Sequence, residues 1–207
     1  MDLQQKYTEL LLKIGFPEND IQQHWFDLEK AYSKKSRYYH NLTHIQYMIA
    51  CYETYFDQLQ FPNEVLYSIF YHDYIYISSK KDNELKSAEY AVKILPKETT
   101  LNSELVFNAI CETQLHQHNE IEDINWLIDF DLKVLARDWD DYKIYFEQIR
   151  KEYRIYPDFL YKPGRAKALK HFLENEFIFQ TDAFRKLYEA KARENIEKEI
   201  NILESKK

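Results

Sequence analysis

The amino-acid sequence predicts an all-α protein: a helical bundle with a helical C-terminal extension. Apolar residues recur at spacings of three and four along most of the 207-residue chain, which is the period of helices that bury one face. The chain contains only two glycines, Gly15 and Gly164, so folds that depend on tight turns are disfavoured. The strand-like stretch IYISS, at residues 75–79, is too short and isolated to seed a sheet.

Helices are expected in order along the first part of the chain, and local signals mark their ends. Gly15 stops the first helix, Pro62 suits the first turn of the fourth, and Pro96 terminates the fifth. Side chains that can cap the start of a helix are Asn19 or Asp20, Asp82 or Asn83, and Asp123. The expected helices cover residues 2–14, about 19–32, 41–57, 62–71, 82–95 and 103–114.

The second part of the chain is also expected to be helical. The periodic segments cover about 123–135, 139–155 and 181–203, and Thr181 opens the last. Before it, PDFLYKPGRA at residues 157–166 is expected to be a loop that precedes a short helix. Because the sequence contains no repeat and no flexible linker, residues 1–207 are interpreted as one domain. Its core covers about 20–140 and the extension about 141–203.

Composition narrows the classes of function. The net charge of −7, from 28 basic and 35 acidic residues, argues against a nucleic-acid polymer as partner. The glycine-rich phosphate loops of nucleotide-binding folds are absent, so any phosphate chemistry must use a metal and side chains. Cys51 and Cys111 form no close pair, and no apolar run reaches membrane-spanning length. We therefore expect a cytoplasmic protein without a membrane partner.

A series of histidines and aspartates is the main functional signal. His40 and His44 are four residues apart, which would place both on one face of a helix that begins there. His72 and Asp73 follow an apolar helix, and a buried pair of this kind needs a partner such as a metal. Taken singly, each feature also has an ordinary explanation: hydrogen bonds at a helix end for the first pair, and a chance dipeptide for the second.

Two further groups of polar residues extend the series. Asp129 and Asp131 are two residues apart and cannot share one helical face, and Asp131 is preferred as the inward residue because apolar positions follow it directly. A solvated carboxylate in a first helical turn is the alternative. His116 and His118 lie in a polar loop, where His116 is the preferred functional residue and exposed loop histidines are the alternative.

The order of these residues resembles the HD-domain superfamily of metal-dependent phosphohydrolases. The resemblance extends over about residues 20–200. Over this range the chain is similar to a bacterial branch of predicted HD hydrolases. It implies that His40, His72, Asp73 and Asp131 are the metal ligands. The segments that carry it, besides the His-Asp pair, are RYYHNLTHI, DNELKSAEYA, DFDLKVLA, EYRIYPDFLYKPGRAKALKHFL and the closing F-x-x-x-Y-E-A-K-A-R-E-N-I.

The implied activity is hydrolysis of a phosphate ester of a small molecule, such as a nucleotide, by a metal-activated water. The cofactor is one divalent ion or two, chosen among Mn, Fe, Ni, Co and Zn, with Mg less suited to a nitrogen-containing site. We expect catalytic roles for Asp73, His116 and Arg37. Auxiliary or substrate-binding roles are expected for His44, Lys86, Glu84 and Asn83, and further candidate phosphate ligands are Lys80, Lys81 and Arg165.

Two other functions stay open at this stage. A regulatory protein could bind metal and nucleotide without turnover, although the intact ligand set argues against it. A di-iron oxygenase of HD type is the other alternative, because His44 and His116 are additional metal-binding side chains. The charged helix at 181–203 is compatible with a homo-oligomer, but its pattern favours a solvated surface helix.

Overall fold

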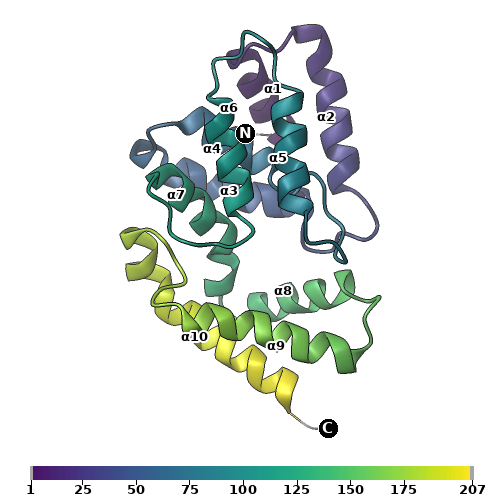
Figure 1. The fold of residues 1–207 in the computed structure, drawn as a ribbon, viewed down its shortest axis with the longest axis vertical. Coiled ribbons are helices and arrows are strands. Elements are labelled where there is room, and N and C mark those ends of the chain that lie inside the picture. The colour runs from purple at the N-terminus through teal and green to yellow at the C-terminus, as the bar shows by residue number, and fades with distance from the viewer. Residues whose placement is uncertain (1, 206–207) are drawn as a thin grey trace.

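The structure, a computed structural model, describes residues 2–205. All regular structure in this range is helical, which confirms the all-α prediction (Figure 1). The α-helices are α1 Leu3–Lys13, α2 Glu18–Tyr32, α3 Leu42–Thr54, α4 Pro62–Tyr71, α5 Asn83–Lys93, α6 Ser103–Glu112, α7 Glu122–Leu132, α8 Trp139–Glu152, α9 Asp158–Glu174 and α10 Asp182–Glu204. The short 3₁₀ helices are η1 Phe56–Gln58 and η2 Lys133–Ala136.

The helices form two neighbouring groups. Helices α1 to α7 make up one group, and α8, α9 and α10 lie together beside it (Figure 1). Helix α9 packs along α10, and α10 packs against η2 at the end of the first group. The three C-terminal helices are therefore positioned to cover one side of the core.

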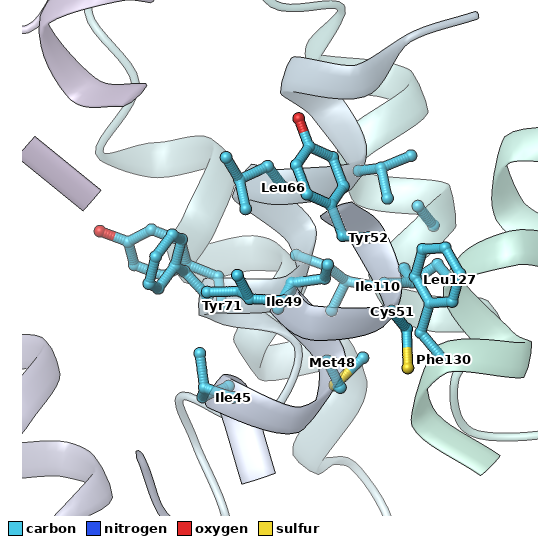
Figure 2. Packing of buried hydrophobic residues seen from close by; sticks show 14 of the residues in the cluster. Ile45, Met48, Ile49, Cys51, Tyr52, Leu66, Tyr71, Ile110, Leu127 and Phe130 are labelled. Atoms are coloured by element: carbon cyan, nitrogen blue, oxygen red, sulfur yellow. The ribbon is translucent and has the colours of Figure 1, made fainter. Parts of the chain in front are cut away.

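Helix α3 lies at the centre of the main hydrophobic core. Its periodic residues Ile45, Met48, Ile49 and Tyr52 are buried, as the spacing of three and four predicts. Figure 2 shows them beside Leu66 and Tyr71 of α4, Ile110 of α6, and Leu127 and Phe130 of α7. Complete burial of an aliphatic side chain contributes about 1.5–3 kcal/mol, so this packing fixes α3 against α4 and α7.

Several helix ends agree with the predicted signals. Pro62 occupies the first turn of α4, and the Thr181 hydroxyl accepts a hydrogen bond from the Phe184 N–H at the start of α10. Two expected caps are wrong. Helix α2 begins at Glu18, before Asn19 and Asp20, because the fixed φ of Pro17 already suits the entry to a helix. Asp123 lies inside α7.

The expected loop at residues 157–166 is also wrong. Helix α9 begins at Asp158 and continues through Pro163 and Gly164. Proline at the sixth residue of a helix removes one intrahelical hydrogen bond, and burial of Tyr161, Ala166 and Leu169 offsets this loss. None of the helices within residues 2–205 has the length and apolar character needed to cross a bilayer.

Candidate metal centre

Three side chains from different helices meet beside the core. His44 projects from the first turn of α3, His72 follows the last residue of α4, and Asp131 lies near the end of α7. One ligand atom from each lies within 4.8 Å of the others. His44 Nε2 is 3.2 Å from His72 Nε2 and 3.1 Å from Asp131 Oδ1. We call these three residues the His44 group.

Asp73 lies next to this group. Its Oδ2 is 3.2 Å from His72 Nε2, and its side chain is almost completely buried. Burial would raise the pKa of Asp73, but the neighbouring His72 and His40 outweigh it and hold the pKa below the ordinary value. Asp73 is therefore an ionised carboxylate beside the His44 group.

His40 lies outside the His44 group, although the sequence analysis made it a ligand in place of His44. Helix α3 begins at Leu42 with Asn41 as its N-cap, so His40 precedes the helix and the four-residue spacing does not fix its direction. Its Nδ1 is 2.6 Å from Glu152 Oε2. The ring stacks on Tyr76 at 4.2 Å between centroids. The structure thus brings His44 to the place for which the sequence suggested His40.

His116 contacts the other oxygen of Asp131. Its Nε2 is 3.1 Å from Asp131 Oδ2, whereas His44 approaches Oδ1. His116 has a positive φ of 53°, a conformation that is uncommon for residues other than glycine. Its carbonyl accepts a hydrogen bond from Gln180 Nε2 at 3.1 Å, which helps to hold this backbone in place. His118 is not part of this arrangement.

The donor atoms fit a divalent transition metal. Two imidazole nitrogens and carboxylate oxygens suit Mn²⁺, Fe²⁺, Co²⁺, Ni²⁺ or Zn²⁺ better than Mg²⁺. With metal–ligand bonds of about 2.1 Å, adjacent donors of an octahedral ion lie about 3 Å apart and opposite donors about 4.2 Å. The separations here are 3.1 and 3.2 Å, and 4.0 Å between His72 Nε2 and Asp131 Oδ1. The donors are thus spaced for one cation.

Second contacts orient the ligand nitrogens. His72 Nδ1 lies 3.0 Å from the Ile69 carbonyl, to which it donates, so Nε2 is the nitrogen left for the site. Burial lowers the pKa of His72, but Asp73, Asp131 and the Ile69 carbonyl raise it overall to about 9. Burial lowers the pKa of His44. The two carboxylates therefore favour a positive charge at this point, whether a proton or a metal ion.

A cavity of about 540 Å³ opens onto this centre. The first group of helices contributes His40, His72, Asp73, His116 and Asp131 to its wall, together with the loop residues Tyr76, Ser78, Ser79, Lys80 and Lys81. Helices α8 and α9 and the loop between them supply the opposite wall. Its lining residues are Tyr145, Ile149, Tyr153, Tyr156, Leu160, Tyr161, Gly164, Arg165 and Ala168. The extension thus forms a tyrosine-rich wall of the cavity opposite the His44 group.

Other residues from the sequence analysis have different positions. Arg37, expected to be catalytic, is buried and donates to the carbonyls of His40 and Asp73 at 3.1 and 2.7 Å and of Tyr74 at 2.9 Å. Because these bonds hold the backbone beside two site residues, Arg37 organises the site and does not line the cavity.

The expected auxiliary residues of α5 also differ in their positions relative to the cavity. The Asn83 side chain binds the backbone of Ile77 and Lys80, which shapes the loop after Asp73. Lys86 is half-exposed and pairs with Asp82 at 2.8 Å. Of these three residues of α5, Glu84 is the one that lines the cavity, and burial raises the pKa of its carboxyl group. Lys80 and Lys81 line it as well.

Of the two aspartates of α7, Asp131 lies in the His44 group, whereas Asp129 is the more deeply buried. Asp129 is fully buried and accepts hydrogen bonds from the Gln180 and Thr181 N–H groups at 2.6 and 2.8 Å and from the Thr181 hydroxyl at 2.6 Å. Its carboxylate therefore attaches the segment before α10 to the core, away from the His44 group.

Glu152 contacts His40 beside the site and is not among the residues that the sequence predicts. It is the last residue of α8, and its Oε1 accepts hydrogen bonds from the N–H groups of Tyr38, Tyr39 and His40 at 2.7, 2.8 and 3.1 Å. Its Oε2 binds His40 Nδ1 and the Tyr76 hydroxyl. Nothing in the local pattern separates Glu152 from the other acidic residues of this charged helix, because its side-chain partners are 76 or more residues away in sequence.

Comparisons of the chain with models of protein families, with curated proteins and with solved structures find no match. A proposal for the function of this chain therefore depends on the geometry of the site.

Proposed function

We propose that this chain is a metal-dependent phosphohydrolase of the HD class, which hydrolyses a phosphate ester of a small molecule such as a nucleotide. The observation that carries the proposal is the His44 group with Asp73 beside it, at the wall of a cavity that lysine and arginine side chains also line. Buried imidazole and carboxylate groups that converge from separate helices are costly unless a cation joins them.

The metal ligands in this proposal are His44, His72, Asp73 and Asp131. His44 replaces the His40 of the sequence-based ligand set because its Nε2 lies about 3 Å from both His72 and Asp131. When bound, a divalent ion would lower the pKa of a coordinated water and polarise a phosphoryl oxygen. The hydrogen bond from His72 Nδ1 to Ile69 keeps that ring oriented toward the ion.

His40 supplies proton transfer in this proposal. Glu152 accepts a hydrogen bond from His40 Nδ1, which leaves Nε2 as the nitrogen that can exchange a proton with a molecule in the cavity. Burial lowers the pKa of His40, but Asp73 and Glu152 outweigh it and raise the pKa above its ordinary value, which increases the share of the protonated ring. His40 Nε2 then donates its proton to the ester oxygen as the P–O bond breaks.

Metal analysis and an activity assay test this function together. The purified protein is analysed for bound metal and is assayed with Mn²⁺, Co²⁺, Ni²⁺, Zn²⁺ or Mg²⁺ on a panel of phosphate esters. The Asp131→Ala variant serves as the inactive comparison, and Asp138→Ala, outside the cavity, as the matched control. We expect metal-dependent release of phosphate that only Asp131→Ala abolishes. Wild-type protein without bound metal and without activity on the panel would contradict the proposal.

One contact keeps oxidative chemistry as a second candidate function. Asp131 Oδ2 lies 3.1 Å from His116 Nε2, whereas Asp131 Oδ1 lies 3.1 Å from His44 Nε2. A carboxylate with a histidine at each oxygen suits a bridging ligand between two metals. A di-iron oxygenase of HD type would contain two irons per chain and consume oxygen. Iron content and oxygen uptake distinguish it from the hydrolase.

A further inference from the structure

We infer that Arg165, held by Glu199, is the fixed cation that binds the phosphate of the substrate from the extension side of the cavity. This inference rests on the proposed function, because it assigns an anionic substrate to the same cavity. Arg165 belongs to α9 and lines the cavity, whereas Glu199 belongs to α10. The assignment would make the extension part of the binding site as well as its cover.

Glu199 fixes the arginine in one orientation. Arg165 Nε is 2.8 Å from Glu199 Oε1, and Nη2 is 3.2 Å from Oε2, so the carboxylate contacts the guanidinium with both oxygens. The Glu199 side chain is completely buried, and its Oε2 also accepts a hydrogen bond from the Tyr142 hydroxyl at 2.6 Å. A carboxylate with this many partners is a rigid support for the arginine.

The guanidinium retains a donor for a ligand. The bonds to Glu199 and to the Tyr145 hydroxyl use only Nε and Nη2. Nη1 has no protein partner among residues 2–205, and it is not one of the buried unpaired polar atoms there. A planar guanidinium with one edge occupied by a carboxylate can offer its other N–H groups to phosphate oxygens.

Arg165 is also connected to the metal centre through aromatic contacts. Its Nη2 is 3.2 Å from the Tyr145 hydroxyl, and the Tyr145 ring lies 4.7 Å from that of Tyr39. The Tyr39 ring in turn lies 4.8 Å from His44. Two aromatic rings therefore link the arginine to a proposed metal ligand, and Arg165 lines the same cavity as His72 and Asp131.

A cation on this side suits the charges of the cavity. Asp73 and Asp131 together offset the charge of one divalent ion, so a phosphate dianion that enters the site still needs positive partners. Lys80 and Lys81 line the cavity but lie on an exposed loop, and no protein contact fixes either ammonium group within residues 2–205. Among the lysine and arginine side chains of the cavity, Arg165 is the one that the surrounding structure holds in place.

Binding of inorganic phosphate to the metal-loaded protein tests this assignment by isothermal titration calorimetry. Arg165→Lys keeps the charge but cannot contact Glu199 and a ligand together. The Arg165→Gln/Glu199→Gln double variant removes both charges, so that no lone carboxylate is left buried. Arg193→Lys is the matched control, because Arg193 also pairs with a glutamate, at 2.7 Å, but does not line the cavity. Thermal unfolding and metal content verify that each variant is intact.

We expect the dissociation constant of phosphate to rise roughly tenfold to a hundredfold in Arg165→Lys and at least as much in the double variant, with the control unchanged. Folded, metal-loaded variants that bind phosphate as the wild type does would overturn the inference, and so would an equal loss in Arg193→Lys or a wild type that does not bind phosphate. If the variants lose phosphate while the wild type hydrolyses no ester, the Arg165 assignment stands and the proposed hydrolase activity fails.

Discussion

Glu152 Oε2 lies 2.6 Å from His40 Nδ1, a contact that joins the last turn of α8 to the segment before α3. The same carboxylate accepts N–H groups from three consecutive residues, Tyr38 to His40. One buried side chain of the extension thus fixes both the backbone and the ring of a site residue.

Replacement of this carboxylate by an amide should destabilise the fold. In Glu152→Gln the amide NH₂ must face either His40 Nδ1 or the backbone N–H groups of residues 38–40, and at least one donor loses its acceptor. We expect a loss of about 1–3 kcal/mol in the free energy of unfolding. Denaturant unfolding measures it, with Glu147→Gln on the exposed side of α8 as control. Equal stability of the two variants would argue against the role of Glu152.

The protonation of His40 predicts the pH dependence of activity. Burial lowers the pKa of His40, and Asp73 and Glu152 outweigh it, so the pKa lies above the ordinary 6.5. If the protonated ring donates to the leaving group, kcat/KM falls as the pH rises through this pKa. His40→Gln should lower kcat about 10²–10⁴-fold and remove this decline, with bound metal retained. An unchanged pH profile in His40→Gln would assign the decline to another group.

Arg37 should be important for stability. Lysine at this position cannot reach the three carbonyls of His40, Asp73 and Tyr74 that the guanidinium contacts. Arg37→Lys should therefore lose about 1–3 kcal/mol of stability and bind metal more weakly, because the backbone beside the ligands loosens. Chemical unfolding and metal titration measure both effects, and the exposed Arg154→Lys serves as reference. Weaker activity at full stability and full metal affinity would restore the catalytic role expected from the sequence.

Asp129 provides a stability test that leaves the metal centre intact. Its carboxylate accepts from Gln180 N, Thr181 N and Thr181 Oγ1, and an amide in Asp129→Asn can accept at one end only. We expect a loss of about 1–3 kcal/mol by denaturant unfolding, with metal content equal to that of wild type. The exposed Asp141→Asn on α8 should change neither quantity. Metal loss in stable Asp129→Asn protein would make Asp129 a ligand.

The sequence predicts the helices well where their periodicity depends on burial. The apolar stripe of α3 is an example, since Ile45, Met48 and Ile49 all lie in the core. The prediction is wrong at α9. Pro163 and Gly164 indicate a loop from local sequence alone, whereas the packing of α9 against α10 is a long-range contact that the local sequence does not reveal. Tertiary packing outweighs local propensity there.

For the site, the sequence identifies most residue types but not their partners. His72, Asp73 and Asp131 are all predicted, and the structure brings them together. The exchange of His44 for His40 depends on where α3 begins, and a shift of one or two residues there changes which side chain follows the helical period. Glu152 and Glu199 reach the site from helices of the extension, which no local motif reveals.

The metal content of two histidine variants tests the central claim most directly. His44→Ala and His40→Ala are purified alongside wild type and His171→Ala, whose side chain is mostly exposed, and bound metal is measured by elemental analysis after saturation and desalting. The His44 group predicts that His44→Ala loses the ion, whereas His40→Ala and His171→Ala retain the wild-type amount. Loss of metal in His40→Ala with full retention in His44→Ala would contradict it.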